Sequence, residues 1–262
     1  MIEETKQEKR QRKLAEAAKR NLAWSANVVD CACLIHDTLY DWCYVEKLYN
    51  SLCRNLTPKV RLHVYTEKNR AVPDHMIHHP LQEWPGIRGP KRSWWYKIQL
   101  FNAQYHQVPM MYFDLDTVIT GNIDWIWRLP TDQFWTVQDF KYLFRNRNPA
   151  INSSVMWFNP AQWNHVYQEF DPDIVAKTRG RWHGDQDYIQ EKIPMEKCRY
   201  FPTNQVASWR WELHDGGYDF LKRKHRTPGT GTVIPDATSV VVFHGHPKPH
   251  EICDPTVLQH WV

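Results

Sequence analysis

Two aspartates separated by one residue follow an apolar run in the middle of the chain. The sequence MYFDLDTVITGN places Asp114 and Asp116 at the end of this run. In an extended segment alternate side chains share a face, so both carboxylates project together while Phe113 and Leu115 pack the other way. Two carboxylates this close repel each other unless a cation lies beside them, and Mg²⁺ or Mn²⁺ takes such oxygen ligands together with substrate phosphates. The motif indicates a metal site, although a polar strand end before a turn has the same pattern.

Three further polar clusters interrupt otherwise apolar segments. They lie within INSSVMWFNP from residue 151, GDQD from residue 184 and HGHPKP from residue 244. In open α/β sheets ligands bind at the carboxyl ends of the strands. We therefore expect these clusters to meet at one edge of a sheet.

The elements that position these clusters follow from hydrophobic periodicity. Residues 26–35 form an apolar run typical of a buried strand, 41–54 have helical spacing, and 60–66 alternate like a second strand. This order predicts a parallel crossover unit in a sheet covered by helices. Four prolines make 67–92 an irregular excursion without its own core. We also expect a helix at 93–105, a strand at 108–114, strands at 134–137, 151–158 and 239–243, a helix opened by Asn159 and Pro160, and a helix at 184–192.

Composition limits the classes of function. The chain has 262 residues and a net charge of +4, and its first twenty residues carry seven Lys/Arg against four Glu. The remainder is nearly neutral, which argues against a nucleic-acid partner. We expect a charged leading helix over 1–22, which could contact an anionic membrane surface or simply lie in solvent, and a single catalytic domain over 23–262.

Other sequence signals concern the cellular compartment and the cofactor class. No apolar run of 18 residues and no secretory leader are present, and the six cysteines form no CxxC pair. These observations favour a cytoplasmic protein with reduced thiols that serve as packing residues. No GxGxxG stands in the sequence, which argues against a classical dinucleotide site.

Taken together, the clusters resemble a GT-A glycosyltransferase. WWYKIQLF before DLD, followed in order by the asparagine, GDQD and HGHPKP segments, resembles the family-eight group of glycogenin-like and bacterial galactosyltransferase-like enzymes. The likeness is greater to bacterial and phage glycosyltransferase-like proteins that have WWxKxxLF before DLD. It spans about residues 27–250. It implies a Rossmann-like, mixed and mostly parallel sheet flanked by helices, which binds a nucleotide sugar.

The resemblance implies a metal centre. Asp114 and Asp116 would hold Mn²⁺ or Mg²⁺ against the diphosphate of the donor, with His244 as third ligand. The family pattern is HxxGxxKP, whereas here His244 directly precedes Gly245. Positions one and three before the glycine share a face of a strand, so the assignment stands, with His246 as the competing ligand. An imidazole suits Mn²⁺ better than Mg²⁺.

The same resemblance assigns basic residues to the donor diphosphate. The segment HGHPKP, residues 244–249, is the closing motif. Lys248 matches the lysine of this motif in the family and would bind the phosphates as a point charge. Gly245 would permit close approach of the backbone to the ligand. Lys97 is the only charged residue in an aromatic helix, so it either snorkels outward or has an anionic or carbonyl partner, and the family has a basic residue here near the nucleotide.

Further residues would bind the donor sugar. Asn152 matches an asparagine that contacts the sugar, and Ser154 stands where the family has glycine. Asp185 would accept hydrogen bonds from sugar hydroxyls, and Gln186 would lie near the anomeric carbon. Alternatively, the acids of GDQD simply complement the dipole of a helix N-terminus.

The exit of the first strand would bind the nucleoside. Tyr40 could stack on the base and Asp37 could bind an amide edge or a ribose hydroxyl, although Tyr44 could serve equally and both tyrosines could be packing residues.

The sequence therefore predicts a metal-dependent hexosyltransferase. It would use a nucleoside diphosphate sugar, most simply a UDP-sugar, and an unidentified glycan, lipid or protein hydroxyl acceptor read by loops 67–92 and 203–232. The resemblance implies retention of configuration, whereas an inverting enzyme would need a base such as Asp187 or Asp139. Two alternatives stay open: a metal-dependent phosphohydrolase, and a non-catalytic module that binds nucleotide sugars or glycans.

Overall fold

The computed structural model describes residues 28–87, 92–140, 150–177 and 181–262. The predicted leading helix over 1–22 lies outside these ranges. Within them, no helix has the length and apolar composition needed to cross a membrane.

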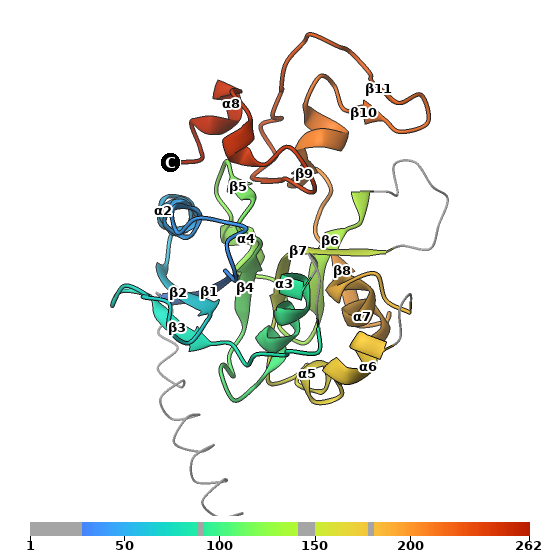
Figure 1. Cartoon of the computed structure of the whole chain (residues 1–262). Helices are drawn as coiled ribbons and strands as arrows, with labels where there is room; N and C mark the ends of the chain where they lie inside the picture. The colour runs from blue at the N-terminus through green and yellow to red at the C-terminus, as the bar shows by residue number, and fades with distance from the viewer. Residues whose placement is uncertain (1–27, 88–91, 141–149, 178–180) are drawn as a thin grey trace, which may run out of the picture.

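A seven-stranded sheet forms the centre of the molecule (Figure 1). Its spatial order is β3-β2-β1-β4-β7-β6-β8. Every neighbouring pair is parallel except the two that involve β7, so β7 alone runs against the others. This confirms the predicted mixed, mostly parallel α/β sheet. The strands are β1 (Val28–Leu34), β2 (Lys59–Thr66), β3 (Ile77–Pro80), β4 (Met110–Phe113), β6 (Phe134–Gln138), β7 (Ile151–Phe158) and β8 (Cys198–Tyr200).

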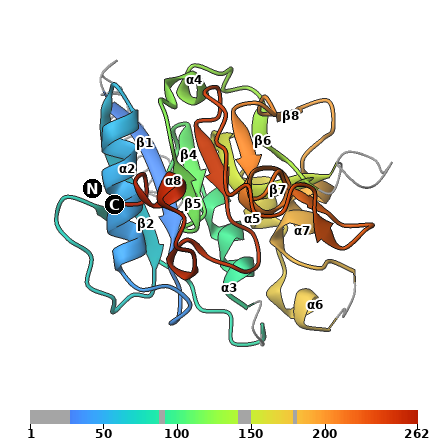
Figure 2. The same cartoon turned by 90° about the horizontal axis from the view of Figure 1, so that it is seen from above.

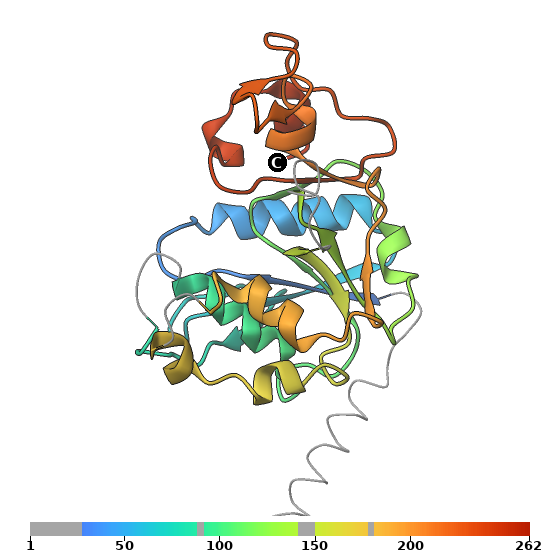
Figure 3. The ribbon, with the colours of Figure 1, turned by 90° about the vertical axis from the view of Figure 1, so that its right-hand side faces the viewer.

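Helices cover both faces of this sheet (Figure 3). The amphipathic helix α2 (Cys43–Asn55) joins β1 to β2 in the predicted parallel crossover and packs on one face. The helices on the other face are α3 (Arg92–Trp95), α5 (His165–Gln168), α6 (Pro172–Lys177) and α7 (Asp185–Lys192).

A cap, residues 206–262, lies beyond α2 (Figures 1 and 3). Its central strand β12 (Val240–Val242) pairs antiparallel with β5 (Thr117–Ile119) and parallel with β9 (Val206–Ser208). Seen from above, the cap lies over the middle of the large sheet (Figure 2). Its other elements are a π-helix (Trp209–Leu213), the hairpin β10 (Tyr218–Asp219) and β11 (Lys224–His225), a 3-10 helix (Pro249–Glu251) and α8 (Pro255–Leu258). A short helix α4 (Asp124–Trp127) follows β5.

Three local predictions were wrong in detail. The helix expected at 93–105 is the short α3 followed by a 3-10 helix over Tyr96–Phe101, and Trp94 is 41% exposed instead of facing the core. Asn159 caps a turn and α5 begins later, at His165. The excursion 67–92 contains the edge strand β3 and buries apolar side chains in the core, namely Leu81, Trp84 and Ile87.

The six cysteines are all free thiols. Three of them are buried packing residues, as predicted: Cys31, Cys33 and Cys198. The other three are exposed, so the prediction that all six are packing residues is wrong for them: Cys43, Cys53 and Cys253.

Candidate active site

The two aspartates lie in a turn between the two sheets. Asp114 directly follows β4, and its backbone N–H donates to the carbonyl of Ser154 on the neighbouring β7 (2.7 Å). Asp116 directly precedes β5, and its carbonyl accepts from the N–H of Phe243 at the end of β12 (3.3 Å). The predicted meeting of polar strand ends is therefore present in the backbone.

Lys97 lies at the centre of a buried polar cluster. Its Nζ is 2.9 Å from Asp114 Oδ1 and 3.3 Å from Asp185 Oδ2, and it donates to Ser153 Oγ (3.0 Å). The Ser153 hydroxyl donates in turn to Asp185 Oδ2 (2.8 Å), and Tyr112 OH donates to Asp114 Oδ1 (2.7 Å). Lys97 therefore does not snorkel outward; the 3-10 helix, β4 and α7 converge on its ammonium group.

Burial and charge compete in this cluster. Burial alone would lower the pKa of Lys97, but Asp114 and Asp185 outweigh it and raise that pKa above its usual range. Burial raises the pKa of Asp185, although Lys97 and Ser153 counteract the shift. Lys97 is therefore a firmly charged ammonium group, and Asp185 is a carboxylate that its surroundings leave short of full stabilisation.

Asp116 has its own lysine from the cap. Lys248 Nζ lies 2.5 Å from Asp116 Oδ2, which also accepts a hydrogen bond from Tyr40 OH (3.0 Å). Lys248 is also 5.5 Å from the centre of the Tyr40 ring. Burial raises the pKa of the Asp116 carboxyl and Asp114 adds to this, whereas Lys248 counteracts it. Burial and the same two acids raise the pKa of Tyr40 far above its usual range, so its hydroxyl is a stable donor.

The charge balance of the site fits a bound cation. Three buried or half-buried carboxylates face two ammonium groups, so the site has one more negative than positive charge. A hard divalent cation is the partner that such oxygen donors prefer. The donor chemistry at Asp114 and Asp116 therefore fits Mg²⁺ or Mn²⁺.

His244 lies near the aspartates in the backbone but contacts other side chains. It follows Phe243, and its Nε2 lies 2.6 Å from Ser208 Oγ, while its ring stacks on Phe140 (4.9 Å between centroids). A metal-binding histidine normally donates its second ring N–H to such a partner, so Ser208 fits that role if Nδ1 is the ligand atom.

Some side chains within the described ranges lie close enough together to share a metal ion, but Asp114, Asp116 and His244 are not among them. Two groups have their ligand atoms within 4.8 Å of one another: the buried Asp30, His63 and His106, and the half-buried His214, Asp215 and His225. Asp114, Asp116 and His244 are thus not gathered as tightly. A shared ion at these three residues stays a prediction.

The closing motif has one feature that requires glycine. Gly245 has φ +72°, a conformation that side chains rarely adopt, and a Cβ there would meet only open space. The competing ligand His246 is exposed, and its Nδ1 lies 2.9 Å from Glu251 Oε2. It is therefore paired with an acid that follows the closing motif.

The predicted donor-sugar residues line the same strand edge. Asn152 is 9% exposed, and its Oδ1 accepts from the Ser154 N–H (3.0 Å), so its carboxamide shapes the β7 backbone beside Asp114. Gln186 follows Asp185 on α7 and is half-buried. The structure brings Asp185 into the Lys97 cluster directly.

The predicted nucleoside residues form two separate groups. Tyr40 packs against Tyr44 (4.7 Å between ring centres), and Tyr44 OH contacts His250 Nδ1. Asp37 is exposed with φ +64°, and its carbonyl accepts from Arg70 (2.7 Å). Its backbone is thus held by Arg70, whose pKa its carboxylate helps to raise.

Sequence reasoning gave no role to Tyr112, Ser153 or Ser208. Tyr112 stands two residues before Asp114, so strand parity could have identified it as a neighbour of that carboxylate. Ser153 was part of a polar cluster, but its bridge from Lys97 to Asp185 depends on three separate elements. For Ser208 the sequence has no comparable signal.

No family model matches the sequence, and no curated protein matches it. Solved structures match the fold. LgtC, a galactosyltransferase crystallised with donor and acceptor sugar analogues, aligns with a TM-score of 0.55 and 15% identity over 87% of this chain and 91% of that chain. An active-site variant of LgtC with glutamine replaced by glutamate aligns with a TM-score of 0.59 and 14% identity over the same shares.

The glycosyltransferase GlyE of Streptococcus pneumoniae TIGR4 also aligns, with a TM-score of 0.59 and 12% identity, over 84% of this chain and 56% of that chain. At these identities the likeness concerns the fold. The chain therefore has the mixed α/β fold of GT-A glycosyltransferases.

Proposed function

We propose that this protein is a metal-dependent glycosyltransferase that moves a hexose from a nucleoside diphosphate sugar, most simply a UDP-sugar, to a hydroxyl acceptor with retention of configuration. The observation that carries the proposal is the joint placement of Asp114, Asp116, Lys97, Asp185 and Lys248 at one edge of a GT-A sheet. No single motif has comparable specificity.

The donor diphosphate would bind between the aspartates and the cap. Asp114 and Asp116, with His244, would hold Mn²⁺ or Mg²⁺, which when bound neutralises the charge that develops on the leaving nucleoside diphosphate. Lys248 now neutralises Asp116. With a cation at Asp116, this ammonium group would turn to the diphosphate, and the positive φ of Gly245 would let the backbone pass close to it.

The nucleoside and the sugar would lie on opposite sides of the diphosphate. Tyr40, with Tyr44 beside it, would offer a ring to the base, and the exposed residue Asp37 would bind the ribose or the base. Asp185 and Asn152 would bind the hexose hydroxyls, with Gln186 near the anomeric carbon.

One observation argues against Asp187 as the base of an inverting enzyme. Asp187, the candidate base of an inverting enzyme, accepts the backbone N–H of His183 (2.8 Å), so its carboxylate is engaged in the turn before α7.

The test is turnover with a panel of nucleotide sugars, with Mn²⁺ and with EDTA. We expect slow release of free nucleoside diphosphate from one donor in Mn²⁺ only, faster when an acceptor is present. Metal-dependent release of inorganic phosphate would instead identify the phosphohydrolase. Tight donor binding with no product over many hours would identify the binding module, and either result would refute the proposal.

A further inference from the structure

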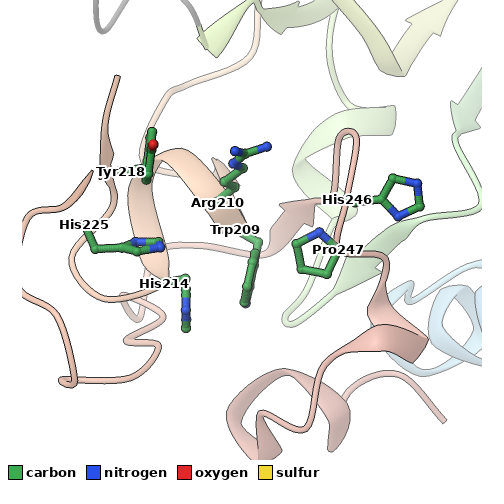
Figure 4. A pocket seen from close by; sticks show the side chains of 7 residues that line it. All are labelled: Trp209, Arg210, His214, Tyr218, His225, His246 and Pro247. Carbon is green, nitrogen blue, oxygen red and sulfur yellow. The ribbon is translucent and has the colours of Figure 1, made fainter. Parts of the chain in front are cut away.

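A cavity of about 320 Å³ lies inside the cap, next to the closing motif (Figure 4). One wall comes from the π-helix and the β10–β11 hairpin, and the other from His246 and Pro247. Pro247 immediately precedes Lys248, which contacts Asp116, and the wall residue Trp209 follows Ser208, which contacts His244. We call this cavity the cap pocket. Its lining residues are Trp209, Arg210, His214, Tyr218, His225, His246 and Pro247.

Arg210 is the strongest feature of the cap pocket. Its guanidinium lies 5.1 Å from the centre of the Trp211 ring and 5.4 Å from that of Tyr218. In the ranges that the structure describes it forms no ion pair with a carboxylate. The aromatic rings hold the guanidinium in place, and no carboxylate in the described part of the chain occupies its N–H donors. These donors can therefore bind an oxyanion in bidentate geometry.

Imidazole and indole donors surround this guanidinium. His214 stacks on Trp209 (4.3 Å, 12°) and meets the edge of His225 (4.9 Å, 86°). Trp209 Nε1 and His225 Nδ1 are buried and have no hydrogen-bond partner within the described part of the chain. Trp209 is only 5% exposed. Unpaired buried polar atoms are costly, and these two belong to side chains that line the cap pocket beside Arg210.

A metal ion is the weaker occupant of this pocket. Asp215 is the single acid of the metal-type group here, and its carboxylate is already used by His214 Nε2 (3.5 Å) and the Gly231 N–H (2.8 Å). The neighbouring Arg210 repels a cation. The same positive charge favours an anion.

The hairpin beside the pocket is basic. Four exposed cations follow one another in the hairpin and just after it, against the single acid Asp219: Lys222, Arg223, Lys224 and Arg226. Such a field attracts anionic ligands toward the pocket mouth. The backbone before β10 packs tightly on the π-helix. Gly217 (φ +88°) lies so close to the Trp211 carbonyl that no Cβ would fit.

We infer that the cap pocket is the acceptor site and that it selects a saccharide carrying a phosphate or carboxylate group. The inference rests on the proposed function, since it assigns the second substrate of the same reaction. Arg210 would bind the oxyanion, and the Tyr218 ring and the histidines would border the sugar. The acceptor hydroxyl would then face the diphosphate side of His246 and Pro247.

The first test is binding without a donor. The protein is titrated separately with glucose, glucose 6-phosphate, glucuronate and inorganic phosphate, and its tryptophan fluorescence is recorded. We expect glucose 6-phosphate or glucuronate to bind at least about tenfold more tightly than glucose, as one charge-assisted contact provides. Arg210→Gln should remove this preference, and Arg210→Lys should restore part of it. Arg128→Gln, which changes an exposed arginine directly after α4, should leave it unchanged. Equal binding of all four probes, or a preference that survives Arg210→Gln, would overturn the inference.

The second test uses turnover and separates the two proposals. In Arg210→Gln we expect the KM of an anionic acceptor to rise at least about tenfold, with donor hydrolysis in Mn²⁺ and the melting temperature unchanged. An unchanged KM would refute the acceptor assignment while the transferase stands. A wild-type chain that turns over no donor refutes the proposed function, and the binding titration still decides whether the pocket prefers anionic sugars.

Discussion

Buried carboxylates occur at both ends of the parallel strands, and their surroundings differ. At one end Asp30, the third residue of β1, lies opposite Arg61 and Met110 in register. At the other end Asp114 and Asp116 follow β4. Both groups are buried or half-buried and both have basic partners, so burial and ion pairing alone do not distinguish a structural site from a functional one.

The Asp30 carboxylate has partners on both of its oxygens. Both Asp30 oxygens accept from Arg61, and Oδ1 also contacts His63 Nε2 (2.8 Å), which is linked through Nδ1 to His79 Nε2 (2.7 Å). Burial would raise the pKa of Asp30, but Arg61 and His63 outweigh it and hold it well below its usual range. Although Asp30, His63 and His106 have metal-type donors, Arg61 holds the carboxylate that an ion would need.

The Asp116 end is less completely stabilised. The pKa values of Asp116 and Asp185 are raised, and the acids there outnumber the lysines. The direction of the pKa shift therefore differs between the two ends, and under the proposed function the carboxylates with the raised pKa are the ones that bind a ligand. Four predictions test this difference, in order of decreasing effect.

Asp30→Ala should lower the free energy of unfolding by about 3–5 kcal/mol, because it removes the buried partner of a half-buried ion pair and leaves Arg61 and His63 Nε2 without this acceptor. Donor turnover per folded molecule should not change. Chemical denaturation and activity are measured on the same sample. Loss of turnover in a fully folded variant would contradict a purely structural role.

Asp116→Asn should reduce donor turnover by about 10²–10³-fold, because the cation loses a charged ligand where leaving-group charge develops. The melting temperature without metal should change little, since burial already disfavours the charged carboxylate. Steady-state kinetics measures the loss of turnover, and thermal unfolding without metal measures the melting temperature. A large drop in stability with normal kinetics would reverse the roles assigned to the two ends.

Lys248→Gln should raise the KM for the nucleotide sugar about tenfold or more, as the diphosphate loses one charge-assisted contact. Binding of Mn²⁺ alone should become tighter, because the competing ammonium group at Asp116 is gone. Calorimetric titration with Mn²⁺, without nucleotide, measures this second effect. Weaker Mn²⁺ binding would show that Lys248 supports the aspartates rather than competing with the ion.

Acid should destabilise the Asp30 end through its histidines. Burial, together with nearby histidines, lowers the pKa of His106 from 6.5 to about 3. The unfolded chain takes up this proton below about pH 6.5 and the folded chain does not, so stability is complete above that pH and falls as the pH decreases toward 3. The slope is about 1.4 kcal/mol per pH unit.

The matched variants are His106→Phe, which should reduce this slope, and His75→Gln, an exposed histidine, which should not. Denaturation midpoints between pH 4 and pH 7 provide the measurement. Identical slopes in His106→Phe and the wild-type chain would show that His106 titrates normally.

Periodicity predicted the central sheet well. Apolar runs or regular hydrophobic patterns predicted five elements that the structure contains: the strands β1, β2, β4 and β7 and the helix α2. In the three-stranded sheet only β12 lies within a predicted strand (239–243), whereas β5 and β9 are three-residue strands that are too short for a periodic pattern.

The site was predictable where chemistry is local. Asp114, Asp116 and Lys97 were found because two close acids and a lone charge among aromatic residues need partners. The pairing of Lys248 with Asp116, and of His244 with Ser208, spans 132 and 36 residues and depends on how the cap meets the large sheet. The spacing of residues along the sequence does not predict which of several basic side chains forms an ion pair with a given acid.

A crystal structure of the protein with UDP and Mn²⁺ tests the central claim most directly. We expect one ion bound by Asp114, Asp116 and His244 and by the diphosphate, with Lys248 moved from Asp116 to a phosphate oxygen. An ion at Asp30, His63 and His106, or a nucleotide bound with the Lys248–Asp116 pair intact, would contradict the account.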